Sequence, residues 1–332
     1  TISGGAKAVF HSDVSAATQI YNAPVELAGY NQNFTGGTGT ITFGSTLATG
    51  WRSPIITADE INFTGGADSV TSTGSLTLGP ATSTLGIQAG HADNNTAALD
   101  LTATDLSAIQ NSFSRLYIGS STGTNTLTLS GTPVQNRITV FLSDTITSAG
   151  FATGTNSAFL MGNEINLSGT NTVSGSGMIA LQPLTITSAV NIGDSIDAGI
   201  DSLDITAADL SALQNGFGNI TIGRSGGTGT ISIKAATTFN DPVTLLSNGS
   251  NGIIAVSNSL TGSGDASLTI TGASTWIGAN IETAGNPITI KANAILSSNA
   301  VFDTTANSSP AGADIIVTGM VDANNENTET LT

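Results

Sequence analysis

Acidic side chains are concentrated in one stretch of the chain, residues 193–209, which reads GDSIDAGIDSLDITAAD. Its carboxylates are Asp194, Asp197, Asp201, Asp204 and Asp209. Clustered carboxylates can supply the general acid and base of a polysaccharide lyase or hydrolase, often beside an Arg or Lys. Only Arg224 follows nearby, and the first copy of this stretch has Asp93, Asp100 and Asp105. The cluster is therefore partly repeated, and solvated carboxylates in turns are the simpler interpretation.

Calcium is a second chemistry that turn carboxylates suit. The sequences closest to the Gly-Gly-x-Gly-x-Asp calcium repeat are GGADSV at 65–70 and GSGDAS at 262–267, and neither keeps the spacing or recurs in tandem. His11 and His91 stand apart, and the chain has no Cys, so no histidine site, Ser-His-Asp triad or cysteine-zinc site is indicated. We expect no metal-binding residues and no cofactor, with weak calcium binding left open.

Binding through other residue types is weakly indicated. Trp51 and Trp276 can stack on sugar rings, and they can equally fill core or edge positions. The Gly-rich turn SGGTG at 225–229 lacks the Lys and the following helix of a phosphate loop. We therefore predict no catalytic and no cofactor-binding residues, and we expect the protein not to be an enzyme.

Composition excludes several classes of protein. The chain has 7 Lys plus Arg against 23 Asp plus Glu, a net charge of -16, which opposes binding to nucleic acid. The absence of Cys excludes a disulfide scaffold and is compatible with a large exported protein. No apolar run is long enough to span a membrane, and TISGGAKAVF at the start does not resemble a signal peptide. We expect a soluble segment with no nucleic-acid partner and no membrane insertion.

A short helical motif occurs twice, as DLSAIQNSF and as DLSALQNGF. Thr102 and Thr206 precede these motifs and are expected to be helix N-caps that form capping boxes with Asp105 and Asp209. The apolar residues that follow have the i, i+3, i+7 spacing of one helix face: Leu106, Ile109 and Phe113, then Leu210, Leu213 and Phe217. We predict short helices at about residues 103–113 and 207–217, with this face packed on the rest of the chain.

The two motifs belong to a long internal repeat. Residues 99–119 and 203–223 share 13 identities in 21 positions at an offset of 104. The copies run from about 60 to 163 and from 164 to 267, and YNAPVEL and FNDPVTL indicate partial copies at both ends. We predict a single continuous domain over residues 1–332.

Between the motifs the chain consists of short alternating strands, such as TGTITFG at 38–44 and GTISIK at 229–234. Apolar residues occupy one face and Thr or Ser the other, and Gly, Asn or Asp end each strand. A long repeat with few aromatic residues favours stacked parallel coils over a sandwich. We predict an all-β fold, a parallel β-helix or β-solenoid. At about 20 residues a coil it would have roughly 16 coils, about five in each repeat.

The segment DLSALQNGFGNITIGRSGGTGTISI, followed by FNDPVTL, resembles the repeats of large secreted exoproteins of the filamentous haemagglutinin type, common in cyanobacteria and other Gram-negative bacteria. The resemblance covers most of the chain and is most specific from Asp105 to Gly119 and from Asp209 to Val243. It implies a right-handed parallel β-helix at the cell surface or in the medium, serving adhesion, aggregation or extracellular matrix. It implies no catalytic residues. The N-terminal secretion domain of such exoproteins is not visible in this chain.

Two functions are therefore expected. The first is a structural or adhesive extracellular rod that self-associates into filaments or bundles, with surface polysaccharide as a further partner. The second is a carbohydrate-binding or polysaccharide-degrading β-helix with one local site. Neither terminus shows an obvious polar cap, so we expect the coils to continue in further repeats or in another copy. A local site should break the repeat, whereas a fibre should preserve it.

Overall fold

Short strands, most of them alternating buried and more exposed side chains, stack in parallel to form a β-solenoid of about 13 turns. The structure, a computed structural model, describes residues 1–92, 97–134, 136, 138–195, 197, 201–305, 311–324 and 328–332. Strands make up 52% of the chain, and the described residues include two short helices. The predicted all-β fold and parallel β-solenoid are confirmed.

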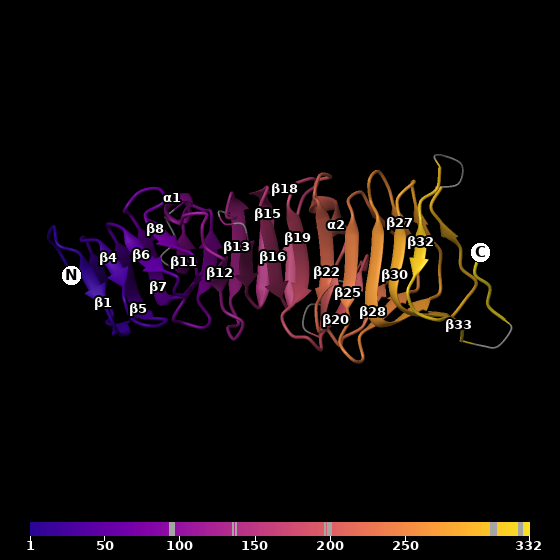
Figure 1. Ribbon diagram of the computed structural model, residues 1–332, viewed down its shortest axis with the longest axis horizontal. Coiled ribbons are helices and arrows are strands. Elements are labelled where there is room, and N and C mark those ends of the chain that lie inside the picture. Colours follow the sequence, from indigo (N-terminus) through magenta and orange to yellow (C-terminus); the bar gives the residue numbers. More distant parts are fainter. Residues whose placement is uncertain are drawn as a thin grey trace. The chain divides into compact units, whose positions relative to one another are not determined.

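Two compact units divide the chain, Thr1–Met161 and Gly162–Thr332. The division lies just before Glu164, where the second predicted copy begins. Within each unit, consecutive turns place their strands side by side (Figure 1). The single continuous domain over residues 1–332 stays a prediction.

Unit 1 arranges its strands on three faces. The first contains β2 (Val14–Ser15), the first halves of β5 (Phe34–Phe43) and β7 (Ile55–Phe63), β9 (Ser75–Gly79), β12 (Arg115–Gly119), β14 (Ile138–Leu142) and β16 (Ser157–Gly162). The second contains β3 (Gln19–Tyr21), the second halves of β5 and β7, then β11 (Ala98–Leu101), β10 (Gly86–Ala89), β13 (Thr126–Gly131) and β15 (Thr145–Gly154). The third contains β1 (Ala8–Phe10), β4 (Val25–Leu27), β6 (Leu47–Gly50) and β8 (Val70–Ser72).

Unit 2 has the same plan. It begins with β17 (Glu164–Leu167) and β18 (Val173–Gly175). One face contains β19 (Met178–Pro183), β22 (Asn219–Arg224), β25 (Val243–Ser247), the first halves of β28 (Leu268–Ile277) and β30 (Ile288–Leu296), and β32 (Ile315–Val317). The next contains β21 (Ser202–Ile205), β20 (Ala189–Ile192), β23 (Ile231–Ile233), β26 (Ile253–Val256), the second halves of β28 and β30, and β33 (Val321–Ala323). The third contains β24 (Thr237–Phe239), β27 (Leu260–Gly262), β29 (Ile281–Thr283) and β31 (Phe302–Asp303).

Inward side chains form columns because the strands stack in register. In unit 2 one column contains Leu181, Ile222, Leu245, Ile270, Ile290 and Val317. In unit 1 the rings of Tyr21, Phe43 and Phe63 stack in consecutive turns, with centroids 5.0 and 5.6 Å apart. Each large apolar side chain buried in this way stabilises the fold by about 1.5–3 kcal/mol.

One turn in each copy is much longer than the others. Leu76 pairs with Leu116, so this turn takes 40 residues, whereas Ile56 pairs with Leu78 after 22. The expected 16 coils of about 20 residues are therefore wrong, as is the estimate of five coils in each repeat. The first copy has four strands on the first face, β9, β12, β14 and β16, before β19 begins the second.

The longer turn contributes an additional strand to one face. Ile87 of β10 pairs with Leu99 of β11 on one side and with Leu127 of β13 on the other. After β9 the chain therefore skips one level of the second face to form β10. It then returns to fill that level with β11, which lies against β7. In the second copy, Val190 of β20 pairs with Leu203 of β21 and with Ile231 of β23. In both copies the helical motif follows this returning strand directly.

Candidate functional site

The helical motif forms α1 (Ala103–Ala108) and α2 (Ala207–Ala212). The predicted capping boxes are present in both copies, because the N-cap Thr accepts from the Asp N–H and the Asp carboxylate accepts from the Thr N–H. The predicted ends at 113 and 217 are wrong. The chain is extended from Ile109 and Leu213, which bridge to Val70 and Val173 of the preceding turn. Pairing with a neighbouring strand therefore ends each helix after six residues.

The motif Asp has a second role that links turns. Asp105 Oδ1 accepts a hydrogen bond of 2.7 Å from the N–H of Phe63, and Asp209 Oδ1 accepts one of 2.7 Å from the N–H of Leu167. Both Asp residues are buried. Burial raises the pKa of Asp209, although hydrogen bonds from Thr206 and Leu167 partly offset that effect. Each carboxylate thus joins the start of its helix to the strand one turn below.

The aromatic residues that end the motifs are buried in the same way. Phe113 is 2% exposed and Phe217 is 1% exposed, so neither ring presents a contact surface. The main chain around them bonds to the turn below: Gln110 N–H donates to Val70 O, and Gln214 N–H donates to Val173 O. The motif is therefore a packing element in both copies.

Carboxyl groups gather in unit 2, beside the longer turn. Glu164 is buried and contacts Asp197, which is exposed. In the orientation that satisfies its neighbours, the Asn166 amide nitrogen lies 2.9 Å from Asp197 Oδ2 and 3.3 Å from Glu164 Oε1. Asp204 is buried and accepts hydrogen bonds from Asn191 and Ser202, at 2.7 and 3.0 Å. This carboxyl cluster consists of Glu164, Asp197 and Asp204.

Glu164 is the strongly perturbed acid of the carboxyl cluster. Burial, followed by the charge of Asp197, raises the pKa of Glu164 to about 8. At neutral pH the Glu164 carboxyl therefore keeps its proton, and it can donate a hydrogen bond to Asp197. A buried protonated carboxyl beside an ionised one is a possible general acid, and it is also a pH-dependent link between a strand and a turn.

The other acids of the predicted acidic stretch lie in different surroundings. Asp209 belongs to the capping box, although the charge of Asp197 also contributes to its raised pKa; Asp194 is half-buried and Asp201 is exposed. Arg224 Nη1 donates to the carbonyls of Pro183 and Leu184, at 3.1 and 2.8 Å, so it links β22 to the preceding turn. Glu164 was not among the residues predicted from the sequence, although it begins the tripeptide EIN, which occurs at 60–62 and again at 164–166.

The first copy differs at the corresponding place. Glu60 is half-buried, Asp100 is buried, and Asp93 lies outside the described residues. A cavity of about 350 Å³ lies here, lined by Asn62, Thr64, His91, Ala92, Thr102, Ala103, Thr104 and Asp105. A second cavity, of about 700 Å³, lies beside Phe113 and is lined mainly by the polar residues Asn111, Ser112, Ser114, Thr155, Asn156 and Ser157. Glu60, the counterpart of Glu164, is not among the described residues that line either cavity.

The described part of the chain contains neither a metal-binding cluster nor a membrane-spanning helix. No group of three or more His, Asp or Glu side chains there is placed to hold a metal ion. No helix there has the length and apolar character of a membrane span. Within the calcium-like word GGADSV, Asp68 has a left-handed φ of 55°, and its N–H donates to Ser107 O of α1.

The two tryptophans lie in different surroundings. Trp276 is half-buried in β28, whereas Trp51 is exposed in a turn after β6, next to Tyr30.

Comparison of the chain with protein-family models, curated proteins and solved structures gave no match. The resemblance to filamentous haemagglutinin-type exoproteins therefore rests on the quoted residues.

Proposed function

We propose that this chain is a structural or adhesive segment of an extracellular β-solenoid exoprotein of the filamentous haemagglutinin type, and that it is not an enzyme. One observation carries the proposal. In both copies the Asp that begins the repeated helical motif, Asp105 or Asp209, accepts a hydrogen bond from the main chain of the preceding turn. A repeated carboxylate that is buried and used in stacking supports a scaffold function, because that group is not available for chemistry at the surface.

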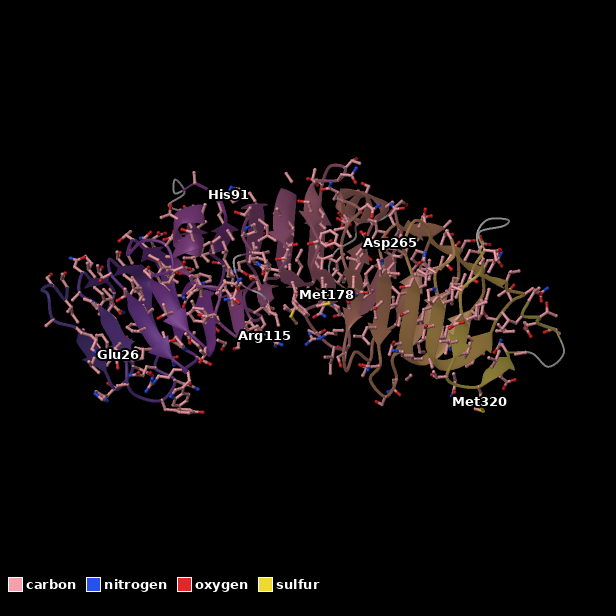
Figure 2. The ribbon with its side chains drawn as sticks, turned by 45° about the horizontal axis from the view of Figure 1, so that its top comes forward. Glu26, His91, Arg115, Met178, Asp265 and Met320 are labelled. Atoms are coloured by element: carbon pink, nitrogen blue, oxygen red, sulfur yellow. The ribbon has the colours of Figure 1, made fainter. Side chains whose placement is uncertain are left out.

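Self-association is the second part of the proposal. The largest group of exposed apolar side chains among the described residues is on and beside β32 and β33: Ile315, Ile316, Met320 and Val321. Met320 points outward from its turn in Figure 2. Exposed apolar groups of this kind favour contacts with another protein surface. The net charge of -16 opposes close approach of copies, so contacts should strengthen with salt.

Sedimentation velocity over a range of protein and salt concentrations, combined with electron microscopy, tests this proposal. We expect species larger than the monomer that increase with protein concentration and with salt. Ile316→Lys should reduce them, whereas Ile186→Lys, at an exposed position in unit 2, serves as the matched control. A protein that stays monomeric under all conditions and adheres to no cell surface would contradict the proposal.

A polysaccharide-degrading solenoid is the second candidate, because a buried protonated Glu164 beside Asp197 has the form of an acid-base pair. Release of reducing ends or of unsaturated sugars from a panel of polysaccharides tests it. If cleavage occurs and is abolished by Glu164→Gln but not by Glu60→Gln, the second candidate replaces the first.

A further inference from the structure

Two aromatic side chains stand out at the surface of unit 1. Tyr30 is 77% exposed and Trp51 is 60% exposed, and every other Trp, Tyr and Phe of the chain is buried or half-buried. Their ring centroids lie 5.9 Å apart at an angle of 56°. Large aromatic rings are normally buried, so a neighbouring pair left in water indicates a contact surface.

Arg52 holds this pair in place. Its Nε donates to Gly29 O and its Nη2 donates to Ala28 O at 2.8 Å, in the turn that carries Tyr30. Its guanidinium carbon lies 5.1 Å from the centre of the Trp51 ring, a cation–π contact. The Trp51 ring therefore rests on a side chain fixed by main-chain carbonyls. A ligand that stacks on it loses little further side-chain entropy. We call Tyr30, Trp51 and Arg52 the aromatic platform.

The internal repeat shows that the fold does not require this platform. The words LATGWRS at 47–53 and FATGTNS at 151–157 lie 104 residues apart. Gly50 and Gly154 have φ values of 65° and 60°. In both turns an N–H donates back three residues, from Arg52 to Thr49 O at 3.2 Å and from Asn156 to Thr153 O at 3.1 Å. The same backbone thus forms with Thr155 in place of Trp51.

Asn156 also performs the structural part of the role of Arg52. Its Nδ2 donates to Val134 O of the turn below at 3.3 Å, as Arg52 donates to Ala28 and Gly29. What the first turn adds is the stacked aromatic surface. A residue pair that breaks the repeat without being needed for the turn is expected of a binding site rather than of a fibre.

We propose that the aromatic platform binds neutral polysaccharide, with the apolar face of a sugar ring stacked on Trp51 and Tyr30. This binding site would supply the class of ligand for the adhesive function proposed above. The inference rests on that proposed function. The exposed faces are two rings rather than a wide apolar area, and the polar Asn31 and Ser53 lie beside them, joined by a 3.3 Å hydrogen bond. A sugar, which combines an apolar face with a hydroxyl rim, fits this arrangement better than a protein helix does.

Charge favours a neutral ligand over an acidic one. The chain carries -16 overall, which repels polyanions. Near the platform, Arg52 and the Lys7–Glu26 ion pair leave only a small local charge. An acidic polysaccharide would therefore gain little at the platform and be repelled by the rest of the chain.

Affinity electrophoresis of residues 1–332 in gels containing galactomannan, xyloglucan or mixed-linkage β-glucan tests the proposal, with alginate as the acidic control. We expect retardation by at least one neutral polysaccharide and none by alginate. The double variant Trp51→Thr with Arg52→Asn, which installs the residues of the second turn, should weaken binding about tenfold or more. Its melting temperature should stay close to that of the parent, because the second turn already folds with these residues.

Fluorescence supplies a readout at the site itself. In a Trp276→Phe background Trp51 is the sole tryptophan, and its emission should change saturably on addition of the polysaccharide that retards the chain. Absence of retardation by all three neutral polysaccharides, equal retardation of the double variant, or retardation by alginate alone would overturn the proposal. If self-association persists in any of these cases, the inference fails while the proposed scaffold function stands.

Discussion

The two longer turns, one in each copy, have the same framework and different chemistry. Both use an Asp to cap a short helix and to accept the N–H of the strand below, at 2.7 Å in each copy. They differ at the repeated Glu, since Glu60 is half-buried whereas Glu164 is buried beside Asp197. The Asp contacts that the two copies share are those that stacking of the turns requires. The repeated Glu is not constrained in this way, so its surroundings differ between the copies.

The turns at 47–53 and 151–157, both in unit 1, likewise combine a shared backbone with different side chains. Their backbones agree, yet one carries Trp51 and Arg52 and the other Thr155 and Asn156. The repeat thus provides an internal control for the fold. Four sets of variants test which features belong to this framework.

The glycine near the end of the strand that follows each helix, Gly119 in β12 and Gly223 in β22, should be the least tolerant framework position. A Cβ on Gly223 would lie 2.4 Å from Leu246 O, and one on Gly119 would lie 1.9 Å from Leu142 O. Gly223→Ala should therefore cost about 3 kcal/mol or more, by separating consecutive turns and straining a left-handed residue. Thermal and urea unfolding measure the loss.

Gly226→Ala is the control for this prediction. Gly226 also has a left-handed φ, of 73°, but a Cβ there would meet nothing within 4 Å. Its replacement should cost about 1 kcal/mol, the penalty of the backbone conformation alone. Equal losses at Gly223 and Gly226 would show that close approach of the turns is not the constraint.

Asp209→Ala and Asp105→Ala should each cost about 2–4 kcal/mol, because each removes a capping box and leaves a buried N–H without its acceptor. We expect similar losses in the two copies, measured by urea unfolding. Ser211→Ala and Ser107→Ala, at exposed positions of the same helices, should change stability by less than about 0.5 kcal/mol. A loss of stability in only one of the two variants would show that the copies do not share this framework contact.

Glu164 should make stability fall as the pH rises. Its pKa is about 8 in the folded chain against an ordinary value of 4.5, so the folded state holds this proton between these values while the unfolded state releases it. The contribution is complete below about pH 4.5 and is lost as the pH rises through 8. Glu164→Gln should flatten the melting temperature over pH 5–9 and stabilise the chain at pH 9 by about 1–3 kcal/mol.

Glu60→Gln, which makes the same change in the first copy, is the matched comparison. The melting temperatures of parent and both variants, recorded in the same buffers, give the comparison. If Glu164→Gln leaves the slope intact, the Glu164–Asp197 pair is not the difference between the copies.

The smallest effect on stability is expected from moving the platform residues into the second turn. Thr155→Trp with Asn156→Arg should change the unfolding free energy by less than about 1 kcal/mol, because the first turn has the same backbone with these residues. Iodide should then quench the fluorescence of the introduced tryptophan, as we expect it to quench that of the exposed Trp51. A large loss of stability would show that the turns are not interchangeable.

Much of the framework was predictable because it is periodic. The alternation in TITF and TISI predicted strands, the offset of 104 predicted the repeat, and Thr102 with Asp105 predicted the capping box. The helix ends and the number of turns were not, because both depend on pairing. Ile109 leaves the helix to bridge Val70, and β11 returns to lie against β7, and neither partner is near in sequence.

The candidate sites divide in the same way. The acidic stretch was visible, but which of its members meet depended on the longer turn, which brings Asp197 to Glu164 and leaves Arg224 bound to carbonyls elsewhere. The sequence shows Trp51 as one of two tryptophans far apart in the chain, whereas the fold brings Tyr30 and Arg52 beside it.

The class of the fold was predictable from the amino-acid sequence, since local alternation, capping and a long repeat are properties of neighbouring residues and of their recurrence. The register of the turns, the burial of Glu164 and the exposure of Trp51 follow only from the folded chain. These depend on which residues lie one turn above or below, about 20 to 40 positions away along the chain. In a solenoid such neighbours supply the burial and the hydrogen bonds that set each side chain's environment.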